Sequence, residues 1–215
     1  MNQNCCSRSS GIGVHDGPEY AVLEEIGKPY EVELVSTMDG STQNKKYLNL
    51  NLNPKGRVPL LLDGKETITE ASAILSYLAL TNPESNLIDT TPLQLTRTIE
   101  WMNWLATIHT QVIAQNWRPE RFTDEGSAYQ GIQNKGMEGL TETSKQINNK
   151  LEHKTWAVGE QYSVADPYLL VFFRWGSRLG LNMREYQHWT RHTESMEKRT
   201  AVQSVLHAEG ISLWE

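Results

Sequence analysis

The only two cysteines of the chain lie side by side near its beginning, at Cys5 and Cys6. A cysteine thiolate can act as a nucleophile, a redox partner or a metal ligand, so this pair is the first candidate for chemistry. Metal binding is disfavoured because there is no further cysteine and the histidines are scattered along the sequence. Two cysteines also cannot build a disulfide framework, so we expect no metal and a reducing, cytoplasmic location.

A second candidate is the stretch NPKGRVPLLLDGKETITEASAILSYL, residues 53–78. Pro59 cannot donate to a sheet ladder, so it marks a sheet edge or a special peptide bond. A cis Val58–Pro59 bond would turn the N–H and C=O of Val58 outward, where an extended peptide could pair with them. Glu70-Ala71-Ser72 begins a helix, and the free N–H groups there favour a carboxylate. These features predict a site for a small acidic peptide, although a ligand-free hairpin followed by a helix explains them equally well.

The elements around these residues divide the chain into two regions. In the first region, some segments have the three- and four-residue apolar spacing of a helix, and others the alternation of a strand. This region predicts a helix over 20–26 that ends at Gly27, a strand over 30–34, a hairpin from 58–62 and 66–69, and a helix over 71–80. The second is helical almost throughout, with helices expected over 95–108, around 136–151, and from Ser163 onward. We therefore predict a domain over 1–81, a linker over 82–91 and a second domain over 92–215.

Composition excludes several classes of partner. The formal net charge of −6 argues against nucleic acid, which is bound through an excess of Lys and Arg. No apolar run approaches the roughly 18 residues that span a bilayer, and the beginning of the chain has no apolar segment typical of a secretion signal. With 21% charged and 38% hydrophobic residues, the sequence is typical of a globular protein that binds neither nucleic acid nor a membrane.

Taken in order, the motifs resemble the cytosolic glutathione S-transferases, and most closely their bacterial beta-type members. The resemblance covers residues 18–210 and rests on the hairpin and helix of 53–78, the helix TIEWMNWLAT of 98–107, and WAVGEQYSVADPY of 156–168. It implies an α+β N-terminal thioredoxin-like domain, with a degenerate first strand, followed by an all-α C-terminal domain. It also implies a homodimer that uses glutathione as co-substrate.

The resemblance also implies which residues bind glutathione. Val58, followed by Pro59 in cis, would pair with the cysteinyl part, and the γ-glutamyl end would meet Glu70, Ala71 and Ser72. Many members have Ser where this chain has Ala71, which keeps the backbone N–H but not the hydroxyl.

In the first long helix, Asn103, Thr107 and His109 would belong to the glutathione site. In the family, the Asn that matches Asn103 and a His about one turn later face the sulfur. His109 lies one position before the family histidine, where this chain has Thr110, and one residue turns a helical side chain by about 100°. Trp117 and Phe122 would line the pocket of the second substrate.

The catalytic group is where this sequence departs from the family, in which a Tyr, Ser or Cys stands at the start of the first helix. Three interpretations remain open. In the first, Ser7, Ser9 or Cys6 stabilises the thiolate, and GIGVHDG of 11–17 is an inserted loop. In the second, His15 takes this position and the first strand falls on the polar stretch 6–11. In the third, the segment has diverged and glutathione is bound weakly or not at all.

The resulting hypothesis is a detoxifying transferase that conjugates the glutathione thiolate to a small apolar electrophile in a cleft between the domains. One alternative is a binding or scaffold protein that keeps the fold without the activity. Another is a glutathione-dependent thiol–disulfide reductase, which would need a reactive Cys5 or Cys6.

Overall fold

A computed structural model describes residues 6–10, 17–34 and 55–214. Contacts divide the chain into two compact units, which we call the first unit (1–88 and 200–211) and the second unit (89–199 and 212–215). The boundary follows Ile88, whereas the segment 200–211 at the far end of the chain joins the first unit. The domain limits 1–81 and 92–215 with their linker stay a prediction.

The first unit contains a four-stranded sheet with the strand order β2-β1-β3-β4. β1 is parallel to β2 and antiparallel to β3, which in turn pairs with β4 as a hairpin. The bounds are β1 Cys6–Ser10, β2 Tyr30–Leu34, β3 Leu60–Asp63 and β4 Glu66–Thr69. This mixed sheet with a β1–α1–β2 crossover is the thioredoxin-like arrangement that the sequence predicts.

The first strand exists, although its sequence is polar and reads as a degenerate strand. Cys6 pairs with both Tyr30 of β2 and Asp63 of β3, and Ser9 pairs with Glu33 and Leu60. A strand between two neighbours has backbone partners on both sides, and these partners do not depend on the type of side chain. Tertiary pairing therefore supplies what the local β-propensity of Cys6–Ser10 does not.

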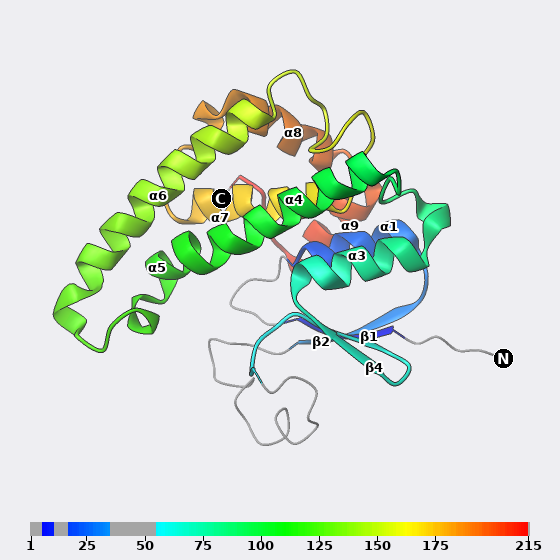
Figure 1. Ribbon diagram of the computed structural model, residues 1–215, viewed down its shortest axis with the longest axis horizontal. Helices are drawn as coiled ribbons and strands as arrows, with labels where there is room; N and C mark the ends of the chain where they lie inside the picture. Colours follow the sequence, from blue (N-terminus) through cyan, green and yellow to red (C-terminus); the bar gives the residue numbers. More distant parts are fainter. Residues whose placement is uncertain (1–5, 11–16, 35–54, 215) are drawn as a thin grey trace. The chain divides into compact units, whose positions relative to one another are not determined.

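Helices α1 (Pro18–Ile26) and α3 (Ala71–Thr81) lie side by side on one face of this sheet (Figure 1). α1 begins at Pro18, which suits a first helical turn, and ends at Gly27, whose φ of 68° few other residues adopt. α9 (Thr200–Glu209) packs against α1. The apolar side chains between these elements are buried: Val22, Leu23, Leu60, Leu61, Ile74, Leu75, Leu78, Val202 and Val205. A short 3₁₀ helix, η2 (Pro83–Ser85), follows α3.

The described residues of the second unit are helical and contain no strand. Its α-helices are α4 (Pro92–Ile108), α5 (Ala114–Trp117), α6 (Tyr129–Lys150), α7 (Ala165–Arg178) and α8 (Gln187–Glu197). A π-helical turn η3 (His109–Ile113) joins α4 to α5, and the 3₁₀ turns are η4 (Pro119–Arg121), η5 (Gly126–Ala128) and η6 (Met183–Glu185). α7 is buried along most of its length, as its apolar sequence predicts. No helix among the described residues has the length and apolarity to cross a bilayer.

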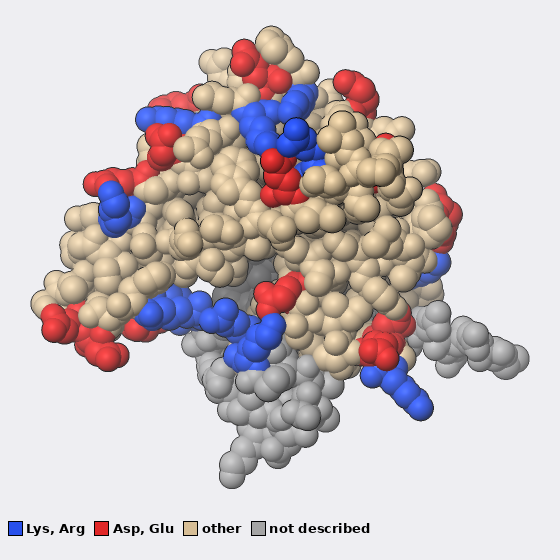
Figure 2. All heavy atoms as spheres, viewed as in Figure 1, with Lys and Arg blue, Asp and Glu red and all other residues tan. Residues whose placement is uncertain are grey.

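Charged side chains of both signs are interspersed on the face of the molecule drawn in Figure 2. Among the described residues, Arg97 pairs with Glu100 at 2.9 Å and Lys135 pairs with Glu138 at 2.8 Å, each three residues apart in one helix. Pairs of this exposed kind contribute little to stability.

The start of α8 is capped by a side chain from another helix. Oδ1 of Asn148, near the end of α6, accepts hydrogen bonds from the backbone N–H of His188 at 2.9 Å and of Trp189 at 3.2 Å. The first N–H groups of a helix have no partner within it, so Asn148 satisfies two that would otherwise be unpaired. This contact fixes the beginning of α8 against α6.

We therefore expect Asn148→Ala to lower the free energy of unfolding by about 1–2 kcal/mol, the usual effect of losing a helix cap. The measurement is urea denaturation followed by circular dichroism. The slope of the unfolding free energy against urea concentration should stay unchanged. Asn149→Ala is the matched control, because Asn149 is the next residue of α6 and is exposed. Equal destabilisation by the two substitutions would contradict the capping role.

Candidate functional site

The predicted peptide-pairing position lies directly before β3. The Val58–Pro59 peptide bond is cis, as the resemblance implies. Val58 and Pro59 are half-buried, and β3 begins at the next residue, Leu60. Within the described residues, no hydrogen bond engages the N–H or the C=O of Val58. A backbone donor and acceptor on one residue at a strand end can pair with an extended peptide.

Glu70 stands at the other end of the hairpin, between β4 and α3. Its backbone has φ 73° and ψ 123°, a region that residues other than glycine rarely adopt. Such a conformation costs of order 1–3 kcal/mol and persists where the surrounding structure or the function requires it. Here it turns the chain directly from β4 into α3, so that the Glu70 side chain is exposed beside the helix start.

The first residues of α3, Ala71 and Ser72, are half-buried, and no described side chain caps this helix. α3 is tied to the hairpin by the hydroxyl of Tyr77, which donates to Oδ2 of Asp63 at 2.7 Å. The hairpin and α3 therefore hold the Val58 backbone and the helix start in one fixed corner of the first unit. This corner presents backbone groups and one carboxylate, which suits a small peptide with a charged amino-acid end.

In the second unit, Asn103 and Thr107 lie one turn apart on α4, and both are exposed. Residues four apart in a helix share a face. The hydroxyl of Thr107 donates to the backbone C=O of Asn103 at 3.0 Å. The hydroxyl of Thr110 donates in the same way to the backbone C=O of Thr107 at 3.1 Å. Asn103, Thr107 and Thr110 therefore form one polar, exposed row.

His109 does not belong to this row, since two residues after Thr107 turn the helix by about 200°. Its ring packs against that of Trp175 on α7, with centroids 5.1 Å apart and planes tilted by 43°. His109 is also the first residue of the π-helical turn η3, in which its C=O accepts from the N–H of Ala114. Such turns add one residue to a helix and are frequent at functional sites.

Trp117, the last residue of α5, joins the same aromatic group. Its ring meets that of Trp175 edge-on at 5.5 Å, and the Arg178 guanidinium lies 5.6 Å from its centroid. Phe172 completes the group at 5.0 Å from Trp175. Phe122, the other predicted pocket residue, follows η4 and is 44% exposed.

Trp175 therefore contacts two predicted site residues, although its sequence position indicates only packing. Its place between His109 and Trp117 depends on how α7 packs against the α4–α5 segment, and no local signal in the sequence reveals it.

The candidates for the catalytic group lie at the beginning of the chain. Cys6, Ser7 and Ser9 are in β1. The backbone there is extended because it pairs with β2 and β3. His15, the remaining candidate, lies outside the described residues, as do all of residues 11–16. Among the described residues, no group of three or more His, Cys, Asp or Glu is placed to hold a metal ion.

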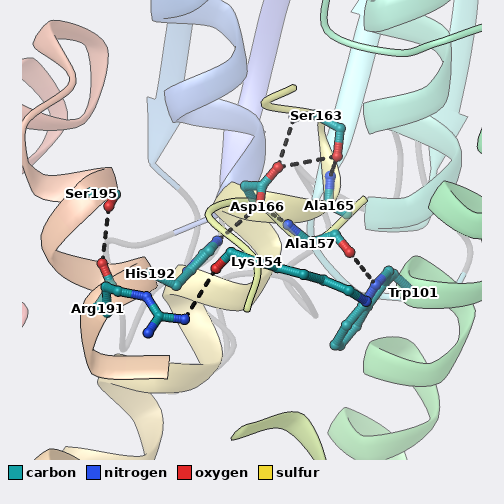
Figure 3. A network of polar contacts seen from close by, with 9 residues as sticks. All are labelled: Trp101, Lys154, Ala157, Ser163, Ala165, Asp166, Arg191, His192 and Ser195. Atoms are coloured by element: carbon teal, nitrogen blue, oxygen red, sulfur yellow. Dashed lines mark hydrogen bonds and ion pairs between the residues drawn. The ribbon is translucent and has the colours of Figure 1, made fainter. Parts of the chain in front are cut away.

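Asp166, in the first turn of α7, is the centre of a buried polar network (Figure 3). Oδ2 accepts from the backbone N–H of Ser163 at 2.7 Å and from its hydroxyl at 3.1 Å. Oδ1 accepts from the backbone N–H of Ala157 at 2.7 Å and from Nε2 of His192 at 2.8 Å. The hydrogen bond from the Ser163 N–H to the Asp166 side chain is one half of a capping box.

The Asp166 carboxylate is thus fully buried and occupied by four donors, so its role is structural. The network continues because the C=O of Ala157 accepts from Nε1 of Trp101 at 3.0 Å. In this way α4, the segment before α7, α7 itself and α8 meet at one acidic group.

We predict that Asp166→Asn lowers the free energy of unfolding by about 3 kcal/mol or more. An amide has one acceptor oxygen, so its NH₂ group would face two of the four donors without room or water to relieve them. Thermal or urea unfolding measures this, with Asp124→Asn at an exposed position as the matched control. A change as small as that of the control would show that the network contributes nothing.

Comparison with known proteins places this geometry in a family. Residues 20–80 match the glutathione S-transferase N-terminal domain, and residues 124–200 match the glutathione S-transferase C-terminal domain. Glutathione S-transferase GstA of Escherichia coli O157:H7 is 30% identical over 194 residues, which cover 89% of this chain and 92% of that protein.

Solved structures agree in fold. A glutathione transferase homologue from Sulfitobacter, determined with bound glutathione, has a TM-score of 0.89 at 25% identity and covers 97% of this chain and 100% of its own. The bacterial beta-class glutathione S-transferase of Sphingomonas chungbukensis has a TM-score of 0.80 at 25% identity, with 96% and 100% covered. The chain therefore belongs to the glutathione S-transferase family and is similar to its bacterial beta-class members.

Proposed function

We propose that this protein is a glutathione S-transferase that binds reduced glutathione and directs its thiolate at a small apolar electrophile. The site is the corner of the first unit formed by Val58, Pro59 and the start of α3. One observation carries the proposal. The backbone N–H and C=O of Val58, which no described residue engages, and the helix start at Glu70-Ala71 are held by a single hairpin and helix.

In this proposal the cysteinyl part of glutathione pairs with Val58 as an added strand. The γ-glutamyl end meets Glu70 and the N–H groups at the start of α3, where Ala71 serves as well as Ser because the backbone makes the contact. One of the candidate groups at the beginning of the chain, Cys6, Ser7, Ser9 or His15, is proposed to contact the sulfur. One relative supports glutathione as the ligand, since the Sulfitobacter homologue was determined with bound glutathione.

The reaction is a nucleophilic transfer. The protein lowers the pKa of the glutathione thiol by a hydrogen bond to the sulfur, and the resulting thiolate forms a carbon–sulfur bond as the leaving group departs. Binding both reactants in one place supplies much of the rate. Trp117, Phe122 and the adjoining Trp175 are the aromatic groups proposed to meet the electrophile. By analogy with its family, we further propose a cytoplasmic homodimer with a role in detoxification.

Glutathione binding is tested by calorimetry with the substitution Glu70→Ala. We expect the Kd for glutathione to rise about tenfold, because the ligand's ammonium loses a charged partner. Glu66→Ala removes an exposed carboxylate from β4, in the same hairpin, and is the matched control. The proposal fails if the unsubstituted protein does not bind glutathione, whereas binding without conjugation of any electrophile would favour the scaffold alternative.

The thiolate-stabilising group is identified by Cys6→Ala, Ser7→Ala, Ser9→Ala and His15→Ala. We expect one of these to lower kcat about a hundredfold and to raise the pKa of bound glutathione, read from thiolate absorbance. Ser10→Ala, in the same strand, is the control. If all four variants match the unsubstituted protein, none of these side chains contacts the sulfur.

A further inference from the structure

Lys55 is a charged residue of the same corner that the family pattern does not single out. It lies in the turn just before Val58, and its ammonium forms an ion pair with Oε1 of Glu70. The same nitrogen donates to Oγ1 of Thr69, at the end of β4, at 3.3 Å. A positive and a negative side chain therefore stand beside each other where α3 begins.

Exposure to solvent distinguishes this pair from a structural ion pair. The exposed fraction is 49% for the side chain of Lys55 and 66% for that of Glu70. An ion pair exposed to this degree is screened and contributes little to the stability of a fold. Both charged groups remain in contact with solvent, where a ligand can replace water.

The chemistry that matches such a pair is the free α-amino-acid end of a peptide, whose ammonium and carboxylate leave the same carbon. We propose that Lys55 binds the α-carboxylate of the γ-glutamyl residue, while Glu70 binds its α-ammonium. The proposal rests on the proposed function and adds a recognition residue to it. In the complex, the charges of Lys55, the ligand's carboxylate, the ligand's ammonium and Glu70 alternate in sign. The ion pair between Lys55 and Glu70 persists.

This arrangement makes Lys55 a specificity residue. The N–H groups at the start of α3 bind any carboxylate that reaches them, whereas the Lys55–Glu70 pair requires both charges of an amino acid in a fixed order. The site therefore selects peptides with a free γ-glutamyl end over peptides that lack either charge.

The test compares two ligands on two proteins by calorimetry. One ligand is glutathione, and the other is 4-aminobutanoyl-Cys-Gly, which has the same chain without the α-carboxylate. Lys55→Met should raise the Kd for glutathione about tenfold and leave the Kd for the analogue unchanged. Lys55→Arg should keep most of the affinity for glutathione, because a guanidinium also binds a carboxylate.

Lys65→Met is the matched control, since Lys65 is an exposed lysine in the turn between β3 and β4. The Kd values of this variant for the two ligands should equal those of the unsubstituted protein. Equal loss of both ligands in Lys55→Met would overturn the proposal, because Lys55 would then act on the fold of the corner. Tighter glutathione binding by Lys55→Met would also overturn it and show that Lys55 competes with the ligand's ammonium for Glu70.

The two levels of the proposal fail differently. If the unsubstituted protein binds neither ligand, the proposed function itself is wrong. If it binds glutathione and Lys55→Met binds it equally well, the function stands and the role of Lys55 does not.

Discussion

The second unit depends on one buried carboxylate. Asp166 has no contact with water, and its two oxygens accept from Ser163, Ala157 and His192, which lie in the segment before α7 and in α8. A buried charge is tolerated only when hydrogen bonds replace those of water, so each of these donors is required in the folded core. Trp101 extends the requirement to α4 through the C=O of Ala157. Aligning these elements also places Trp175 of α7 against His109 and Trp117.

In the first unit the corresponding constraint is on the backbone. A cis peptide bond before β3 and a positive φ at Glu70 mark the two ends of one hairpin, and α3 is tied to that hairpin through Tyr77 and Asp63. The proposed recognition of glutathione uses main-chain groups at both ends. A main-chain contact of this kind does not depend on the side chain of Ala71. In the proposed complex, specificity then falls to two charged side chains of the same corner, Glu70 and Lys55.

The two regions also differ in how well their local sequence specifies them. Periodicity and caps predicted α1, β2, the β3–β4 hairpin and α3 nearly to the residue, because Gly27 and the Asp63-Gly64 turn leave few alternatives. The polar sequence of Cys6–Ser10 indicated a degenerate first strand. The strand forms because β2 and β3 pair with it on both sides. α6 begins at Tyr129, seven residues before the predicted Gly136, because its first turns carry few apolar residues.

The sequence by itself indicated the family, through several motifs in a fixed order. It also predicted the hairpin and helix of residues 58–80 and the helix that begins near Ser163, because each depends on residues close together in the chain. Only the tertiary structure decided that His109 packs on Trp175, and that Asp166 also binds His192. It likewise paired Lys55 with Glu70 across the β3–β4 hairpin. The physical reason is the same in each case: these contacts join residues from separate elements, and helix and strand packing, rather than local propensity, sets which side chains meet.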